Sequence, residues 1–259
     1  MKSIVFIDID GTLLRRNFMP ESAKRAIETA QKNGHKVILN TGRAKADIDP
    51  LLWEIDFDGY CLSTGAHIIL DHEVKEYKTM PKNVFDHLKN TFGTMHLTWM
   101  AEGSEKLFCH FDNKEHLKKA YRLEDDDPWL QLKDPCEMSE EDLKQVLVIS
   151  VHDFSQSPDE IRALLPEDYV LTLTGFGGDI HHVDYDKATA IDHVLNHFEG
   201  DWRTIAIGDS DNDIAMMERA DIGICMKDGS ENAKAAADYI TDTIENDGIY
   251  NAFSHYGLI

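Results

Sequence analysis

The stretch Ile4-Val5-Phe6-Ile7-Asp8-Ile9-Asp10-Gly11-Thr12 decides the fold. Its apolar beginning predicts a buried strand, and its Gly-Thr end predicts a turn. Because side chains alternate along a strand, Asp8 and Asp10 leave the chain on the same side. Two carboxylates this close repel each other unless a divalent cation lies between them or one of them carries a proton. The stretch therefore predicts a reactive site at the end of a buried strand, with an ordinary polar turn as the alternative.

The composition is that of a globular protein with a large excess of acidic residues. The 259 residues are 42% hydrophobic and 29% charged, and the formal net charge is -22 at pH 7. The length allows one large domain or two, with a sizeable buried core. So much negative charge argues against a nucleic acid or an anionic membrane as partner. An anionic substrate would need positive charge concentrated locally, from a metal ion, Lys, Arg or backbone N–H groups.

The cysteines and the start of the chain indicate a compartment. No two cysteines form a Cys-x-x-Cys pair, and each lies in or near an apolar segment; they are Cys61, Cys109, Cys136 and Cys225. We expect buried thiols in a reducing compartment. Asp8 and Asp10 interrupt the only apolar start, which argues against a signal peptide, and no apolar run approaches transmembrane length. These features predict a cytoplasmic protein.

Both ends of the chain show an alternation of strands and helices. In the N-terminal part we expect a strand over 3–8, a helix over 21–32, a strand over 36–40, a helix over 44–54, a strand over 59–63 and a hairpin over 67–77. In the C-terminal part we expect a helix over 187–198, strands over 202–207, 222–225 and 239–241, and short helices between them. This order predicts an α/β fold, with a Rossmann-like parallel sheet core covered by helices.

The middle of the chain has a different pattern, typical of an inserted α+β cap domain with an antiparallel sheet. The expected elements are helices over 84–91, 114–122 and 158–165 and strands over 96–100, 106–111, 146–151 and 170–173. We therefore predict a core from 1–81 and 183–259, and a cap over 82–182 that selects the substrate. The glycine-rich segment 174–179 is either a mobile loop that contacts substrate or a simple long turn.

Reactive residues gather where predicted parallel strands end, the edge at which ligands bind to such sheets. Asp8 and Asp10 follow the first strand, Thr41-Gly42-Arg43 follows the second, and the run 208–213 follows a C-terminal strand, while Lys187 opens a helix. Taken singly, Thr41-Gly42 could be a helix cap, Lys187 a surface lysine, and 209–213 an acidic first turn of a helix. Taken together, they predict a site for a metal ion and a phosphate.

With these motifs the chain resembles the haloacid dehalogenase-like phosphatases, and within them the Cof-type group, which has a large α/β cap. The resemblance covers nearly the whole chain. It is carried, in the family's order, by Asp8-Ile9-Asp10-Gly11-Thr12, Thr41-Gly42-Arg43, Lys187 and Gly208-Asp209-Ser210-Asp211-Asn212-Asp213. A further match is Ser63-Thr64-Gly65-Ala66, although the family usually has Asn-Gly in place of Thr64-Gly65.

The resemblance implies a role for each motif. Asp8 would be the nucleophile that forms an aspartyl-phosphate, and Asp10 would be the general acid and then the general base. Mg²⁺ would be held by the Asp8 carboxylate, the Asp10 backbone carbonyl and Asp209. Asp213 would support the site. The phosphate-binding residues would be Thr41, Gly42, Arg43, Lys187 and Asn212.

The expected function is hydrolysis of a small phosphorylated metabolite, such as a sugar phosphate, by a Mg²⁺-dependent phosphatase. The alternative is a phosphomannomutase-like phosphosugar mutase, which would want a cationic cap, whereas this cap has Arg122 and Arg162 among many acids. A module without catalysis would lack a carboxylate, and a dehalogenase would leave Asp10 without a task. Aromatic residues of the cap stack on a ligand or pack in its core; they are Trp99, Phe108 and Phe111. We expect a small phosphorylated metabolite as partner, and neither a nucleic acid nor a membrane, while the sequence leaves the oligomeric state open.

Overall fold

The computed structural model describes residues 1–15, 18–95, 97–109, 132–133, 135–152, 157–174 and 177–259. They form two compact units. The first comprises Met1–Thr41, Pro50–Glu76 and Asp186–Ile259, and the second comprises Gly42–Asp49 and Tyr77–Tyr185. The boundaries predicted from the sequence were after residues 81 and 182, with 42–49 in the core. The short segment Gly42–Asp49, which directly follows Thr41, instead groups with the insert.

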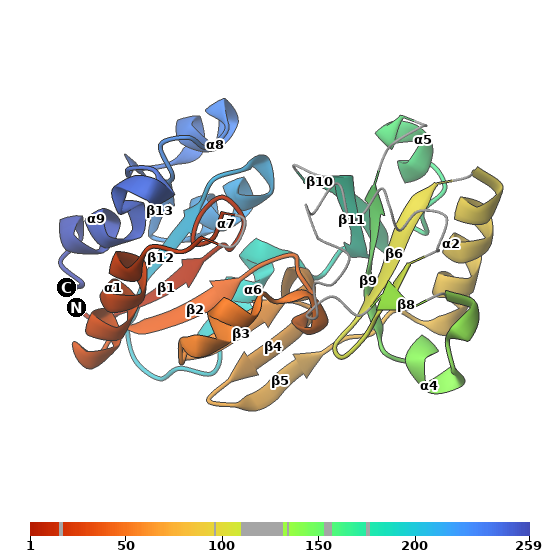
Figure 1. Ribbon diagram of the computed structural model, residues 1–259, viewed down its shortest axis with the longest axis horizontal. Coiled ribbons are helices and arrows are strands. Elements are labelled where there is room, and N and C mark those ends of the chain that lie inside the picture. Colours follow the sequence, from red (N-terminus) through yellow and green to blue (C-terminus); the bar gives the residue numbers. More distant parts are fainter. Residues whose placement is uncertain (16–17, 96, 110–131, 134, 153–156, 175–176) are drawn as a thin grey trace. The chain divides into compact units, whose positions relative to one another are not determined.

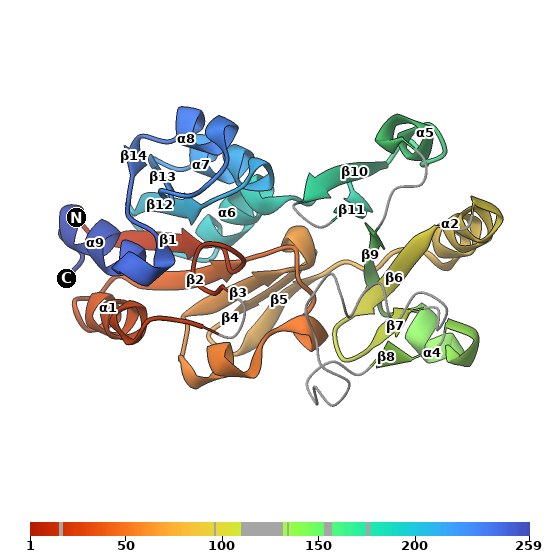
Figure 2. The ribbon, with the colours of Figure 1, turned by 45° about the horizontal axis from the view of Figure 1, so that its top comes forward.

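The first unit is built on the α/β sheet that the sequence predicts. The sheet has the strand order β14-β13-β12-β1-β2-β3-β4-β5 (Figures 1 and 2). The strands are β1 (Ser3–Ile7), β2 (Lys36–Asn40), β3 (Gly59–Leu62), β4 (His67–Leu70), β5 (Glu73–Tyr77), β12 (Arg203–Gly208), β13 (Ile222–Cys225) and β14 (Tyr239–Ile240). Pairing from β14 through β3 is parallel, and β4 joins β3 antiparallel. The Rossmann-like core is confirmed.

Helices cover both faces of this sheet. Helix α1 (Glu21–Lys32) has the predicted bounds, and it buries the predicted stripe of Ala23, Ala26, Ile27 and Ala30. It packs beside α9 (Gly248–His255), a helix that the sequence analysis did not foresee (Figure 2). On the other face, α6 (Lys187–Leu195) and α7 (Ile214–Arg219) pack on β1 and β2, with α8 (Glu231–Ala236) beside them. The short helices of this unit are η2 (Pro50–Glu54), η3 (Ser63–Gly65), η6 (Asp211–Asp213) and η7 (Ile244–Asn246).

The predicted helix over 44–54 is wrong. The chain forms two separate 3₁₀ turns there, η1 (Lys45–Asp47) and η2 (Pro50–Glu54). Pro50 has no N–H to donate, and its ring disfavours the helical conformation for the residue before it, so a continuous α-helix cannot cross this point. The interruption also separates the segment that joins the second unit from the segment that returns to the first.

The second unit contains the predicted antiparallel sheet. Its strand order is β10-β11-β9-β6-β7-β8, antiparallel except between β7 and β8. The strands are β6 (Thr98–Gly103), β7 (Leu107–Cys109), β8 (Leu132–Lys133), β9 (Val146–His152), β10 (Tyr169–Thr174) and β11 (Gly177–His182). The helices among the described residues are η1, α2 (Lys82–Met95), η5 (Pro135–Glu137), α4 (Glu140–Leu143) and α5 (Pro158–Arg162). The predicted helix over 114–122, Phe111 and Arg122 lie outside the described residues.

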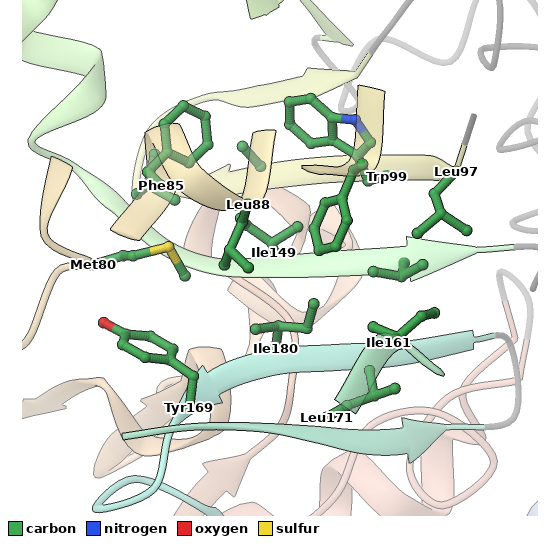
Figure 3. Close-up of a cluster of buried hydrophobic side chains, with 14 of the residues drawn as sticks. Met80, Phe85, Leu88, Leu97, Trp99, Ile149, Ile161, Tyr169, Leu171 and Ile180 are labelled. Atoms are coloured by element: carbon green, nitrogen blue, oxygen red, sulfur yellow. The ribbon is translucent and has the colours of Figure 1, made fainter. Parts of the chain in front are cut away.

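The two faces of this second sheet differ in character. One face packs its apolar side chains under α2 and α5, and Trp99 and Phe108 belong to this core (Figure 3). Core packing of these aromatic residues is thus confirmed over ligand stacking. Strand alternation and register place polar residues on the opposite face, where several are buried. They are Thr98, Glu102, Ser150, His152, Thr172, Asp179 and His181.

The glycine-rich segment is largely strand. Gly177 pairs with Thr174 across the β10–β11 ladder, so residues 177–179 are neither a mobile loop nor a long turn, and 175–176 lie outside the described residues. Gly177 has φ +155°, and a Cβ there would lie 2.1 Å from the backbone O of Val151. Glycine therefore lets neighbouring backbone approach at this point.

The four cysteines are thiols and form no disulfide. Three are buried as expected, but Cys136 is exposed, so the expectation was wrong for that residue. Cys136 lies in η5, a short helix at the surface of the second unit. Among the described residues, no helix is long and apolar enough to cross a membrane.

We expect His35 to make the fold sensitive to acid. The Ser3 N–H donates to His35 Nδ1 at 3.1 Å, and burial and the nearby Arg203 lower the pKa of this imidazole. A lowered pKa favours the neutral ring in the folded state. The stabilisation is therefore present above the unfolded pKa of about 6.5 and is lost below it, by at most about 1.4 kcal/mol per pH unit.

Urea unfolding of the wild type and His35→Asn at pH 7.5 and 5.5 checks this. Asn can still accept from Ser3 but does not titrate, so its unfolding free energy should fall less between the two pH values. Equal falls in both proteins would contradict a role for His35.

Candidate active site

The nucleophile candidate Asp8 is held by the centre of the parallel sheet. It follows β1, and its N–H donates to the backbone O of Ile207 at 3.0 Å. Because side chains alternate, Asp8 shares a face with Ile4 and Phe6, the face covered by α6 and α7. Its side chain is 6% exposed. The strand thus delivers a carboxylate to a nearly dry position.

Lys187 joins this carboxylate to a second one. Its Nζ lies 2.6 Å from Asp8 Oδ1 and 2.6 Å from Asp213 Oδ1, and all three side chains are buried. Helix α6 begins at Lys187 because Asp186 caps it, in a reciprocal capping box with Thr189. The cap therefore sets where the lysine leaves the backbone.

Asp213 also organises the loop after β12. Its Oδ2 accepts the N–H groups of Asp209 and Ser210, each at 3.0 Å. A Cβ on Gly208 would lie 2.4 Å from the Cβ of Asp213, so only glycine leaves room for this carboxylate. In the same turn, Ser210 Oγ donates to Asn212 Oδ1 at 2.5 Å. The spacing from Gly208 to Asp213 is therefore set by the packing of Asp213 on Gly208 and by its hydrogen bonds within this turn.

Asp209 meets the loop that follows Asp8. Thr12 Oγ1 donates to Asp209 Oδ1 at 3.1 Å. Gly11 has φ +84°, and a Cβ there would lie 2.3 Å from Asp209 Oδ2. The glycine of the first motif is thus required both for the left-handed turn and for the approach of Asp209. Gly11 and Thr12 belong to the motif predicted from the sequence, but their contacts with Asp209 were not predicted.

Negative charge dominates the centre of the site. Carboxylate oxygens of Asp8, Asp209 and Asp213 lie within 4.8 Å of one another. Burial and the Asp213 carboxylate raise the pKa of Asp8 well above its usual value and that of Asp209 to about 7, and Asp10 contributes to both shifts. Burial alone would lower the pKa of Lys187, but Asp213 and Asp8 raise it, so the ammonium stays charged.

One ammonium cannot neutralise three clustered carboxylates. A divalent cation would offset the remaining repulsion, and oxygen donors are what Mg²⁺, Mn²⁺ and Ca²⁺ bind. Asp213 already contacts Lys187 and two backbone N–H groups, which leaves Asp8 and Asp209 as the better donors of the three. The residues present therefore fit a divalent metal ion.

The second motif is divided between the two units. Thr41 is buried at the end of β2; its N–H donates to Cys61 O at 2.9 Å, and its backbone O accepts from the Thr64 N–H at 3.1 Å. Gly42 and Arg43 belong to the second unit, where Arg43 Nη1 donates to the backbone O of Asp47 at 2.8 Å. The structure thus clusters Asp8, Lys187, Asp209 and Asp213, while phosphate binding by Gly42 and Arg43 stays a prediction.

A model of the haloacid dehalogenase-like hydrolases matches residues 5–253. The chain belongs to this family. With its α/β core and inserted cap, it is a Cof-type member and a phosphatase of the haloacid dehalogenase type. The resemblance drawn from the four sequence motifs is confirmed.

Individual relatives span nearly the whole chain. The 5-amino-6-(5-phospho-D-ribitylamino)uracil phosphatase YcsE of Bacillus subtilis is 26% identical, over 98% of this chain and 96% of its own. Among solved structures, the subclass IIB sugar phosphatase BT4131 is 27% identical, with a TM-score of 0.85 and full coverage of both chains. The phosphatase BT1666 of Bacteroides thetaiotaomicron is 26% identical, with a TM-score of 0.84, over 100% of this chain and 96% of its own.

We expect Lys187→Met to lower the free energy of unfolding by about 3–5 kcal/mol, because removing one partner leaves buried carboxylates without their cation. The measurement is urea unfolding with a chelator present. Lys234→Met is the matched control, since Lys234 pairs with the exposed Glu231. Losing that surface pair should cost less than about 1 kcal/mol. Equal losses in the two variants would show that the Lys187 pairs contribute no more than a surface contact.

Proposed function

We propose that the protein is a Mg²⁺-dependent phosphatase that hydrolyses a small phosphorylated metabolite through an aspartyl-phosphate intermediate. The observation that carries this proposal is the buried Lys187 ammonium, held between Asp8 and Asp213 beside Asp209. A carboxylate can attack an anionic phosphate only where positive charge offsets their repulsion. Lys187 supplies part of that positive charge locally, and a divalent metal ion would supply the rest.

The two carboxylates of the first motif divide the chemistry. An Asp8 carboxylate oxygen bonds to phosphorus as the bond from phosphorus to the leaving oxygen breaks, and Asp10 gives that oxygen a proton. Asp10 then takes a proton from a water that attacks phosphorus. The bond between phosphorus and Asp8 breaks, which releases inorganic phosphate and regenerates both residues.

The remaining motif residues bind and position. We assign contacts with the phosphoryl oxygens to Lys187, Thr41, the Gly42 backbone, Arg43 and Asn212. Asp213 is the positioning residue, because it fixes Lys187 and the turn that carries Asp209. Phosphoryl transfer depends mainly on positioning and charge stabilisation, which is what this set offers.

We assign the metal site to the carboxylates of Asp8 and Asp209 and the backbone carbonyl of Asp10. Mg²⁺ bound there would supply positive charge against the phosphate and the clustered carboxylates. Carbonyl and carboxylate oxygens suit Mg²⁺, which keeps several waters and needs few protein ligands. The close approach of Asp209 that Gly11 permits supports this assignment.

We assign substrate choice to the cap and favour a sugar phosphate or a similar polyhydroxylated phosphomonoester. Support comes from the likeness to a subclass IIB sugar phosphatase. Support also comes from the polar face of the second unit. There His152 Nε2 lies 3.1 Å from Ser150 Oγ, and His181 Nε2 lies 2.8 Å from Thr172 Oγ1. Hydroxyl and imidazole groups hydrogen-bond readily to the hydroxyls of a sugar.

We expect Asp8→Asn to abolish phosphate release, because an amide is not a competent nucleophile. Release from a panel of phosphorylated metabolites, with and without Mg²⁺, measures this. The control is Asp211→Asn, a nearby exposed carboxylate that contacts Ser230 and Asn232 and should leave turnover unchanged. Unchanged turnover in Asp8→Asn would contradict the proposal. Conversion of one sugar phosphate to another, with little release of free phosphate, would favour the phosphosugar mutase.

We expect Mg²⁺ to raise the melting temperature of the wild type, since a ligand that binds only the folded state stabilises it. Asp209→Asn should lose most of this shift, because the variant removes a charged donor from the cluster. Thermal melts with increasing MgCl₂, with Asp211→Asn as the neighbouring control, test this without turnover. A full shift in Asp209→Asn would remove that residue from the metal site.

A further inference from the structure

Asn40 is an amide in an apolar place. It ends β2 after Val37-Ile38-Leu39, and it is completely buried. The register pairs Leu39 with Ile7, so the next position along both strands sets Asn40 beside Asp8. It therefore lies on the same sheet face as the nucleophile candidate, beneath α6 and α7. Its polarity could have been noticed in the sequence, as the one break in the apolar run before Thr41.

The amide nitrogen ties β2 to the two helices of the site. Asn40 Nδ2 donates to the backbone O of Lys187 at 2.8 Å and lies 3.5 Å from Met216 Sδ. The opposite orientation would set the amide oxygen against the Lys187 carbonyl oxygen, two acceptors facing each other. The donor therefore belongs on this side.

The amide oxygen of Asn40 has no hydrogen bond to match that of the amide nitrogen. Among the described residues, no group donates a hydrogen bond to Asn40 Oδ1, although this atom is buried. A buried acceptor without a partner is destabilising, whereas an apolar side chain of similar shape can be neutral or stabilising there. Stability alone therefore does not account for an amide at this position.

We propose that Asn40 is a positioning residue for Lys187. By holding the first carbonyl of α6, it fixes the point from which the lysine reaches between Asp8 and Asp213. The turn after β3 packs against the same helix start, since a Cβ on Gly65 would lie 3.0 Å from the Asp186 backbone O. A displacement of about 1 Å at a catalytic group can cost about 100-fold in rate.

The test is Asn40→Leu, which keeps a branched side chain of similar size and removes both polar atoms. We expect kcat for phosphate release to fall about 10- to 100-fold, with a smaller change in KM, while the urea midpoint stays the same or rises. A lower kcat together with an unchanged or higher urea midpoint is expected only if Asn40 has a functional role. Asn40→Ala, which cannot overpack the site, should show the same loss of kcat.

Thr241→Val is the matched control. Thr241 is also buried in the first unit, and its Oγ1 donates to the backbone O of Gly248 at 2.7 Å. This variant also removes a buried bond from a side chain to a carbonyl, but away from Lys187. We expect a lower urea midpoint with unchanged kcat.

A crystal structure of Asn40→Leu supplies a readout that does not need turnover. We expect Lys187 Nζ to have moved out of hydrogen-bond range of Asp8 or Asp213. The kinetic part of the inference rests on the proposed function, and the Asp8→Asn experiment tests that function separately. Wild-type kcat in both Asn40 variants, or an unmoved Nζ, would overturn the positioning role even where the phosphatase activity is established.

Discussion

The bridge of Lys187 between Asp8 and Asp213 is the constraint on which the rest of the site depends. It joins the end of β1, the start of α6 and the turn after β12, which are far apart in the sequence. Burying charges is costly unless each has partners, so these three elements must meet with good geometry. The parallel sheet meets this demand, because neighbouring strands end at one edge and bring their loops together there.

Close packing around that bridge fixes several small residues. Gly208 makes room for the Asp213 side chain, and Gly11 makes room for Asp209. In both places a Cβ would lie under 3 Å from the carboxylate residue, so these glycines are positions of contact as well as turns. The carboxylates are thereby crowded together, and the raised pKa values of Asp8 and Asp209 follow first from burial and then from this crowding. The same crowding makes the site suitable for a divalent cation.

The sequence predicted the parts of the structure that are governed by local pattern. Helix α1 was found to the residue because its alanine stripe repeats with helical period and Asn33-Gly34 ends it. Asp8, Asp209 and Asp213 were expected to lie together because they follow predicted strands, and Lys187 because it opens a helix where the chain returns to the sheet. The helix predicted over 44–54 was wrong, because Pro50 prevents a continuous α-helix there. The glycines of β11 were taken for a loop or turn because the contacts that require them are not local; Gly177 meets the Val151 backbone, and Gly178 meets Leu171 and the Thr172 backbone.

Asn40 shows why the supporting residues of a site are harder to predict than its charged ones. A carboxylate within an apolar run indicates a functional site, because burying a charge is costly. An amide at the end of a strand indicates no function by itself, until the group that it hydrogen-bonds is known. That partner, the Lys187 carbonyl, is 147 residues away. The orphaned oxygen of the same amide indicates that this position favours placement of the lysine over stability. The exact position of the Lys187 ammonium matters in a protein this acidic, because it is the cation that the chain itself supplies between Asp8 and Asp213.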